Sequence, residues 1–107
     1  MREFDEMHRQ LRIAYGLALE RARKADWPVE SKFAAAVGMP LNTYRRTEDG
    51  ERAVTAPELD VIEKVLEIPP GTLRAEAWKI VEAGQIPSHA ERAAESWRAA
   101  LNPKRRP

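Results

Sequence analysis

The segment LNTYRR, which begins at Leu41, concentrates side chains that could form specific hydrogen bonds with a ligand. It contains an amide on Asn42, a hydroxyl on Thr43 and guanidinium groups on Arg45 and Arg46. Arginine can bind guanine and asparagine can bind adenine through paired hydrogen bonds, and an apolar side chain such as Leu41 can contact the methyl group of thymine. We therefore expect these five residues to contact DNA bases. The alternative is an ordinary solvated helix face, because 33% of the chain is charged.

Contacts with DNA phosphates would also need donors outside this segment, because phosphate contacts fix the register of a protein on the duplex. Lys32, before the segment, and Arg52, after it, are the candidates. The net charge of +1 supports nucleic-acid binding only weakly. The charges between residues 38 and 56 also cancel, so DNA binding would depend on where each charge lies on the surface.

The elements that carry these residues are predicted to be helices. Apolar residues recur at spacings of three and four, and no segment alternates with the period of a strand, which predicts an all-α fold. The predicted helices cover residues 2–25, 29–37, 41–49, 72–83 and 88–101, and a further helix starts at the TAPE motif of residues 55–58. In TAPE, Thr55 and Glu58 form a capping box. The helices on either side of Gly38 form a helix-turn-helix arrangement, in which the second helix lies in the major groove.

The face of the predicted helix over residues 41–49 follows from its period of 3.6 residues. Positions 41, 42, 45 and 46 share one exposed side, with position 43 at its edge. Tyr44 and Thr47 point more inward on the same helix. The exposed side thus carries the groups that could read bases.

Composition argues against an enzyme or a metal protein. The chain of 107 residues has no cysteine and only two histidines, His8 and His89, so we expect no metal site. Each histidine lies beside acids within one predicted helix, in DEMH and SHAE, and no glycine-rich phosphate loop is present, so we expect no catalysis, no cofactor and no small-molecule ligand. No apolar run approaches the roughly 20 residues that span a bilayer, and no signal peptide is evident. A cytoplasmic protein is therefore expected.

A pattern of apolar, glycine and charged positions runs through residues 19–73 with fixed spacing. Its residues are Leu19, Arg23, Phe33, Ala34, Val37, Gly38, Met39, Asn42, Thr43, Tyr44, Glu48, Gly50, Arg52, Thr55, Ile62, Leu66, Ile68 and Leu73. With this pattern the chain resembles the lambda-repressor-like (Xre/Cro) family of helix-turn-helix DNA-binding proteins. The resemblance implies a five-helix domain, here with an extended first helix and a C-terminal helical extension. It also implies that Arg23 and Glu48 form a structural ion pair that orients the recognition helix.

Three residues depart from the family pattern. Pro40 stands where a small polar residue usually caps the recognition helix, so the start of that helix is expected to shift toward Leu41 or Asn42. Glu30 and Asp49 place carboxylates near the expected DNA, and Glu30 is expected to turn away from it. If Glu48 turns inward to its partner, the DNA-facing side becomes locally positive.

Three parts are expected along the chain. Residues 1–73 form the helix-turn-helix domain with its extended first helix, residues 74–101 form the C-terminal extension, and residues 102–107 form a disordered basic tail. Proteins of this kind pair to read half-sites about one DNA turn apart. We expect a homodimer through residues 74–101, because this segment carries apolar residues that the five-helix core does not require, notably Trp78, Ile80, Val81 and Trp97. The alternative is that the tryptophans close the core of one subunit.

These features predict a sequence-specific transcriptional regulator of double-stranded DNA, acting as a repressor that occupies an operator and excludes polymerase. A phage or mobile-element immunity protein, or a Cro-like protein, fits this description, in the cytoplasm and at the nucleoid of a bacterial or phage-infected cell. One alternative is an antitoxin whose terminal helices cover a toxin. The other is a protein-interaction module that has lost DNA binding, which Pro40, Glu30 and Asp49 favour.

Overall fold

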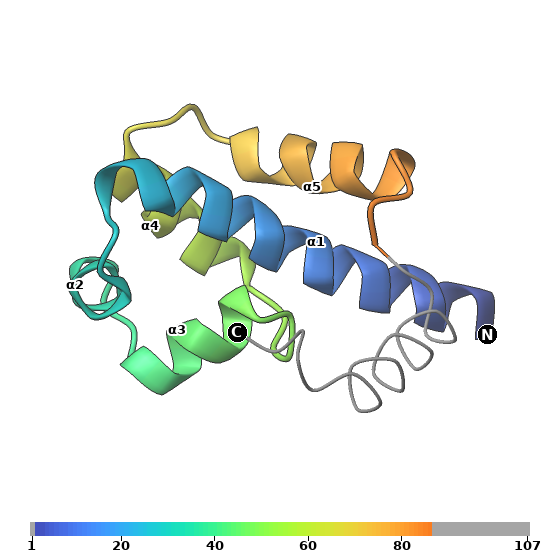
Figure 1. The fold of residues 1–107 in the computed structure, drawn as a ribbon, viewed down its shortest axis with the longest axis horizontal. Helices are drawn as coiled ribbons and strands as arrows, with labels where there is room; N and C mark the ends of the chain where they lie inside the picture. Colours follow the sequence, from blue (N-terminus) through green and yellow to red (C-terminus); the bar gives the residue numbers. More distant parts are fainter. Residues whose placement is uncertain (1, 87–107) are drawn as a thin grey trace, which may run out of the picture.

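The computed structural model describes residues 2–86, which form a bundle of helices around one long helix (Figure 1). This range contains five helices and no strand: α1 (Arg2–Asp26), α2 (Glu30–Ala36), α3 (Leu41–Glu48), α4 (Ala56–Leu66) and α5 (Thr72–Glu82). The predicted all-α class is confirmed for the described residues, and the helix ends lie within about one residue of the predicted ones. The predicted helix over 88–101 and the tail 102–107 lie outside the described residues.

The long helix α1 organises the bundle and packs against α3, α4 and α5. Figure 1 shows α5 alongside α1 and running in the opposite direction. The buried hydrophobic side chains of the core are Ala14, Ala18, Leu19, Phe33, Ala34, Val37, Tyr44, Ile62, Leu66, Leu73, Ala77, Ile80 and Ile86. In the part of the chain that the structure describes, no helix combines the length and the apolar character needed to cross a membrane.

The start of α4 confirms the predicted capping box. The Glu58 backbone N–H donates to Thr55 Oγ1 at 3.3 Å, and the Thr55 N–H donates to Glu58 Oε1 at 2.9 Å. Two backbone donors at the helix start are satisfied in this way. A cap of this kind stabilises a helix by about 1 kcal/mol.

The helix α5 belongs to the core of the subunit rather than to a separate extension. Its residues Leu73, Ala77 and Ile80 are buried, and Val81 packs against the core. The predicted boundary at residue 73 therefore falls inside a continuous helix. Ile80 is part of the core cluster and Val81 packs partly buried against it, so both contribute to packing within one chain.

The N-terminus of α5 is held by Glu63, a buried carboxylate that the sequence analysis did not single out. Glu63 accepts the backbone N–H groups of Gly71 at 3.1 Å and Leu73 at 3.0 Å. An anion at this position satisfies orphan donors and interacts favourably with the positive end of the helix dipole. The contact fixes the direction in which α5 leaves α4.

A glycine allows α3 to lie directly on α1. A β-carbon built on Gly16 would come within 2.3 Å of the backbone oxygen of Glu48, the last residue of α3. Nearby, Arg12 Nε donates to the backbone oxygen of Gly50 at 2.7 Å, and Gly50 has a positive φ of 80°. Glycine weakens an isolated helix, so Gly16 serves the packing between helices instead.

Candidate nucleic-acid interface

The connection between α2 and α3 is a tight turn of Val37, Gly38, Met39 and Pro40. The N–H of Gly38 donates to Ala35 O at 3.1 Å, and that of Met39 donates to Ala34 O at 2.9 Å. Gly38 has a φ of 75°, which suits glycine at the end of a helix. Pro40 occupies the N-cap position without a side-chain cap, and α3 begins at Leu41.

Three of the five predicted base contacts lie together on the open face of α3. Asn42, Arg45 and Arg46 are exposed, and their spacing of three and four residues places them side by side on the helix. Leu41 and Thr43 are half-buried. The side chain of Leu41 packs partly against the core. The Leu41 side chain is therefore less exposed than the helical period alone predicts.

The inward face of α3 is anchored by Arg23 of α1. Its Nε and Nη2 donate to the two carboxylate oxygens of Glu48 at 2.9 and 3.0 Å, and the two side chains are only 3% and 5% exposed. Tyr44 Oη donates to Glu48 Oε2 at 2.5 Å, and Arg23 Nη1 donates to the backbone oxygen of Trp27 at 2.8 Å. This set, which we call the buried anchor (Arg23, Tyr44, Glu48 and Trp27), joins α3 to α1 and to the turn after α1.

Arg23 and Tyr44 are the hydrogen-bond donors to Glu48 within the buried anchor. The hydrogen bond from Arg23 to Glu48 raises the pKa of Arg23 above its ordinary value. Burial, and secondly its hydrogen bond to Glu48, raises the pKa of Tyr44 well above its ordinary value of 10.0. Both groups therefore keep their protons and remain donors. Buried charges are tolerated when they are paired and hydrogen-bonded, so α3 is held in one orientation.

Aromatic packing fixes α2 beside the same anchor. The ring of Phe33 lies 5.6 Å from Trp27 and 5.4 Å from Tyr44, edge-on in both cases. Such pairs contribute about 0.5–1.5 kcal/mol beyond the apolar area they bury. The α2–α3 unit is thus attached to α1 through both apolar and charged contacts.

The two predicted phosphate contacts differ in their surroundings. Lys32 is exposed on α2. Arg52 is half-buried and already engaged: Nη1 donates to Thr47 Oγ1 and Glu58 Oε1, both at 3.0 Å, and Nη2 donates to Glu58 Oε2 at 2.8 Å. The hydrogen bond to Glu58 raises the pKa of Arg52. Arg52 therefore ties the loop after α3 to the start of α4.

Both exposed arginines of α3 have an acid beside them. Arg45 Nε lies 3.8 Å from Glu30 Oε2, and Arg46 Nε lies 3.8 Å from Glu51 Oε2. The expectation that Glu30 turns away from DNA stays a prediction; in the structure its carboxylate lies beside Arg45. Asp49 is exposed beyond the last turn of α3.

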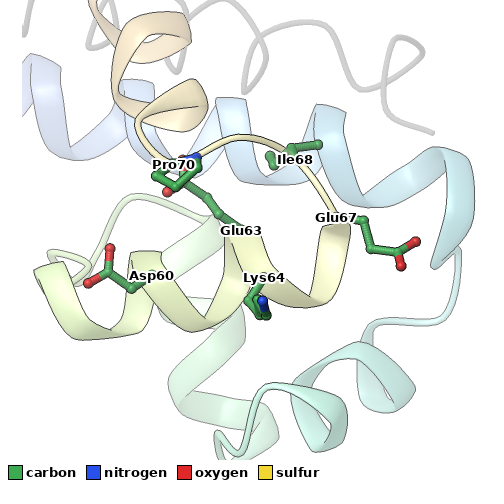
Figure 2. A pocket seen from close by; sticks show the side chains of 6 residues that line it. All are labelled: Asp60, Glu63, Lys64, Glu67, Ile68 and Pro70. Carbon is green, nitrogen blue, oxygen red and sulfur yellow. The ribbon is translucent and has the colours of Figure 1, made fainter.

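A surface pocket of about 460 Å³ lies elsewhere, over α4 and the turn that follows it (Figure 2). Its lining residues are Asp60, Glu63, Lys64, Glu67, Ile68 and Pro70. Figure 2 shows Asp60 and Lys64 on α4 and Glu67 just after its end, pointing in different directions rather than toward one point. The carboxylate of Glu63 is already bound to backbone N–H groups. An anionic ligand would meet an excess of acids here.

Two side-chain contacts around the candidate interface were not predicted from the sequence. The hydroxyl of Tyr44 binds Glu48, and the spacing of four residues on one helix could have indicated this contact. The bond from Arg12 to Gly50, by contrast, joins residues 38 positions apart, and no local pattern reports it.

Comparisons of the chain with protein-family models, with curated proteins and with solved structures found no match.

Proposed function

We propose that the protein is a sequence-specific regulator that binds double-stranded DNA, and that α2 and α3 act as a helix-turn-helix unit resembling that of lambda-repressor-like proteins. In this proposal α3 enters the major groove, α2 crosses the backbone, and operator occupancy represses transcription. The observation that carries the proposal is the exposed amide and guanidinium face of Asn42, Arg45 and Arg46 on a rigidly anchored helix.

The dimensions and polarity of α3 suit base reading. Its eight residues make about two turns and about 12 Å of helix, so one face can meet a few consecutive base pairs. Arginine at such a face binds guanine and asparagine binds adenine. The buried anchor also removes the charge of Glu48 from this surface, because the carboxylate faces Arg23. The DNA-facing side is consequently less acidic than the summed charges of residues 38–56 indicate.

Phosphate contacts would complete the interface. We assign Lys32 to this role because its ammonium group is exposed on the helix that crosses the backbone. Arg52 is the second proposed phosphate contact, and its guanidinium would exchange Glu58 for a phosphate on binding. Such contacts set the register on the duplex without reading its sequence.

A homodimer remains part of the proposal, with a different surface from the one expected. The expected contact lay on residues 74–101; Ala77 and Ile80 of this range pack within the chain and residues 87–101 lie outside the described residues, so we propose a contact through the start of α1. Phe4 and Met7 are 48% and 44% exposed there, one turn apart on α1. Exposed apolar side chains of this size on one helix face favour a protein contact.

The same two side chains favour a second candidate function, in which the protein binds another protein through α1, alone or as an antitoxin that also binds DNA. Base-reading groups on α3 are not needed for the purely protein-binding role. Selection of DNA sites separates DNA binding from the purely protein-binding role, because a protein-only module enriches no sequence.

The test begins with selection of bound sites from random duplex DNA by the full chain. Arg46→Ala should then weaken binding to the selected site by about 1–3 kcal/mol and relax the preference at one base position. Arg74→Ala, an exposed arginine on α5, is the matched control and should leave binding unchanged. Light scattering on the same complexes counts the chains per site.

Two results would contradict the proposal. No enrichment of any sequence would remove the DNA-binding function itself. Equal weakening by Arg46→Ala on selected and random duplexes would leave DNA binding in place but make Arg46 a phosphate contact rather than a base contact.

A further inference from the structure

Arg52 lies where α3, the loop after it and α4 meet. Its backbone N–H donates to Arg46 O at 3.1 Å, so its backbone lies next to the last turn of α3. Its guanidinium donates to Thr47 Oγ1 of α3 and to both carboxylate oxygens of Glu58 of α4, at 2.8–3.0 Å. The Arg52 and Glu58 side chains are only 27% and 22% exposed. This pair therefore differs from the ion pairs of Arg45 and Arg46, which lie at 3.8 Å on the open surface.

The contact with Glu58 affects how Arg52 can bind a phosphate. A carboxylate and a phosphodiester make the same demand on arginine, because each binds the planar guanidinium fork through two parallel hydrogen bonds. Glu58 already binds Nη1 and Nη2 in this way. A phosphate that approached with the carboxylate in place would meet a pair of zero net charge and the repulsion of an adjacent anion. Arg52 can therefore bind one of the two anions strongly at a time.

Each side chain of the pair has another partner that does not depend on the pair. Arg52 Nη1 also donates to Thr47 Oγ1, and Glu58 Oε1 also accepts the Thr55 N–H at 2.9 Å. The capping box of α4 consists of Thr55 and Glu58 alone, so it does not require Arg52. Opening of the pair consequently costs about as much as one partly exposed ion pair, which a phosphate contact can offset.

We propose that Glu58 is an autoinhibitory residue of the DNA interface, which occupies the guanidinium of Arg52 until a phosphate of duplex DNA displaces it. The inference rests on the proposed DNA-binding function and adds to it a competitor within the protein. In the free protein Arg52 fastens the loop to α4, and on DNA the same guanidinium contacts the backbone. Because every duplex offers the same phosphates, Glu58 lowers the affinity for all sequences by the same factor.

Glu58→Gln separates the charge of this residue from its role in the cap. Glutamine also serves in capping boxes, so its amide oxygen can still accept the Thr55 N–H, whereas the negative charge that holds Arg52 is lost. Melts followed by circular dichroism check that the variant is folded at the temperature of the binding assay. Fluorescence anisotropy then measures its affinity for the selected site and for a random duplex, between about 50 and 200 mM salt.

Glu58→Gln should bind both duplexes about two- to fivefold more tightly than the parent, although it is the less stable protein. The ratio between the two affinities should stay constant, because the competitor acts on a phosphate contact and not on a base contact. The salt dependence should steepen by about one phosphate contact. An ion pair that only supports the fold gives a different result, because a loosened loop would bind DNA no better than the parent does.

Two controls test whether the effect passes through Arg52. In an Arg52→Gln background, Glu58→Gln should give no gain in affinity, since the guanidinium is already absent. Glu76→Gln changes the net charge by the same amount at a carboxylate that pairs with Lys79 at 3.2 Å on the surface of α5. This variant should leave both affinities unchanged.

Two outcomes would overturn the role of Glu58 while DNA binding by the parent stays in place. The first is parent-like or weaker binding by Glu58→Gln. The second is a gain that persists in the Arg52→Gln background, which would show general repulsion by an acid near DNA rather than competition for one guanidinium. A parent protein that binds no duplex is a distinguishable result, because it removes the proposed function and this inference with it.

Discussion

Removal of the Glu48 carboxylate is the most informative perturbation of the fold. Glu48→Ala deletes the acceptor of three hydrogen bonds, two from Arg23 and one from Tyr44, at 2.5–3.0 Å. It leaves a guanidinium that is 3% exposed without its counter-charge and a buried hydroxyl without its acceptor. Breaking a buried ion pair by removing one partner costs about 3–5 kcal/mol.

That cost is large for a domain of this size. Small domains have a total free energy of unfolding of about 5–15 kcal/mol. Since 1 kcal/mol shifts the midpoint by about 4–8 °C in domains of 60–100 residues, the Tm should fall by roughly 12–40 °C. The remaining bond from Arg23 to the backbone of Trp27, at 2.8 Å, lowers the loss only in part.

Thermal and urea unfolding followed by circular dichroism measures the effect. Glu82→Ala, an exposed glutamate at the end of α5, is the matched control and should change stability by less than about 0.5 kcal/mol. The double variant Arg23→Met/Glu48→Leu removes both charges and should recover much of the lost stability. A loss below about 1 kcal/mol for Glu48→Ala, or no recovery in the double variant, would refute the reasoning that a stranded charge dominates.

Two further predictions concern packing and pH. Gly16→Ala should destabilise the protein by about 1–3 kcal/mol, because the added carbon meets the Glu48 backbone oxygen at 2.3 Å. This loss is expected even though alanine favours helix more than glycine does. An unchanged or higher Tm would contradict the close approach of α3 to α1. Glu58→Gln should lower stability by about 1 kcal/mol at pH 7, because Arg52 and the N–H of Thr55 hydrogen-bond the carboxylate and hold the pKa of Glu58 below its ordinary value of 4.5. A folded-state pKa that is lowered gives stability that is present above pH 4.5 and is lost as pH falls through the lower value, so the Tm difference between parent and variant should shrink in melts at pH 3. A difference that stayed constant between pH 7 and pH 3 would show that charge plays no part.

Local features of the sequence were enough to predict the helices and the residues on the outer face of α3. Apolar residues spaced by three and four, interrupted by glycine and proline, indicate where helices begin and end because these preferences act within a few residues. The capping box of Thr55 and Glu58 is local in the same sense. The exposure of Asn42, Arg45 and Arg46 follows from helical periodicity once Tyr44 and Thr47 are placed inside.

The contacts that give the candidate interface its character depended on the tertiary structure. Gly16 appears in the sequence as a weak point of a helix, and only the approach of α3 explains it. Glu63 appears as one more charge on an amphipathic helix, yet it binds backbone groups eight and ten residues further on. Periodicity reports which side of a helix is apolar, but it carries no information on which distant group a polar side chain will reach.

The acids beside Arg45 and Arg46 illustrate the same division. From composition alone, Glu30 and Glu51 count against DNA binding, because they cancel positive charge. Glu30 Oε2 lies 3.8 Å from Arg45 Nε across the turn between α2 and α3, and Glu51 Oε2 lies 3.8 Å from Arg46 Nε beyond the end of α3. The sequence by itself determined which residues α3 exposes; the packing of α2, α3 and α4 decided which atoms face them, because that geometry depends on contacts between separate helices.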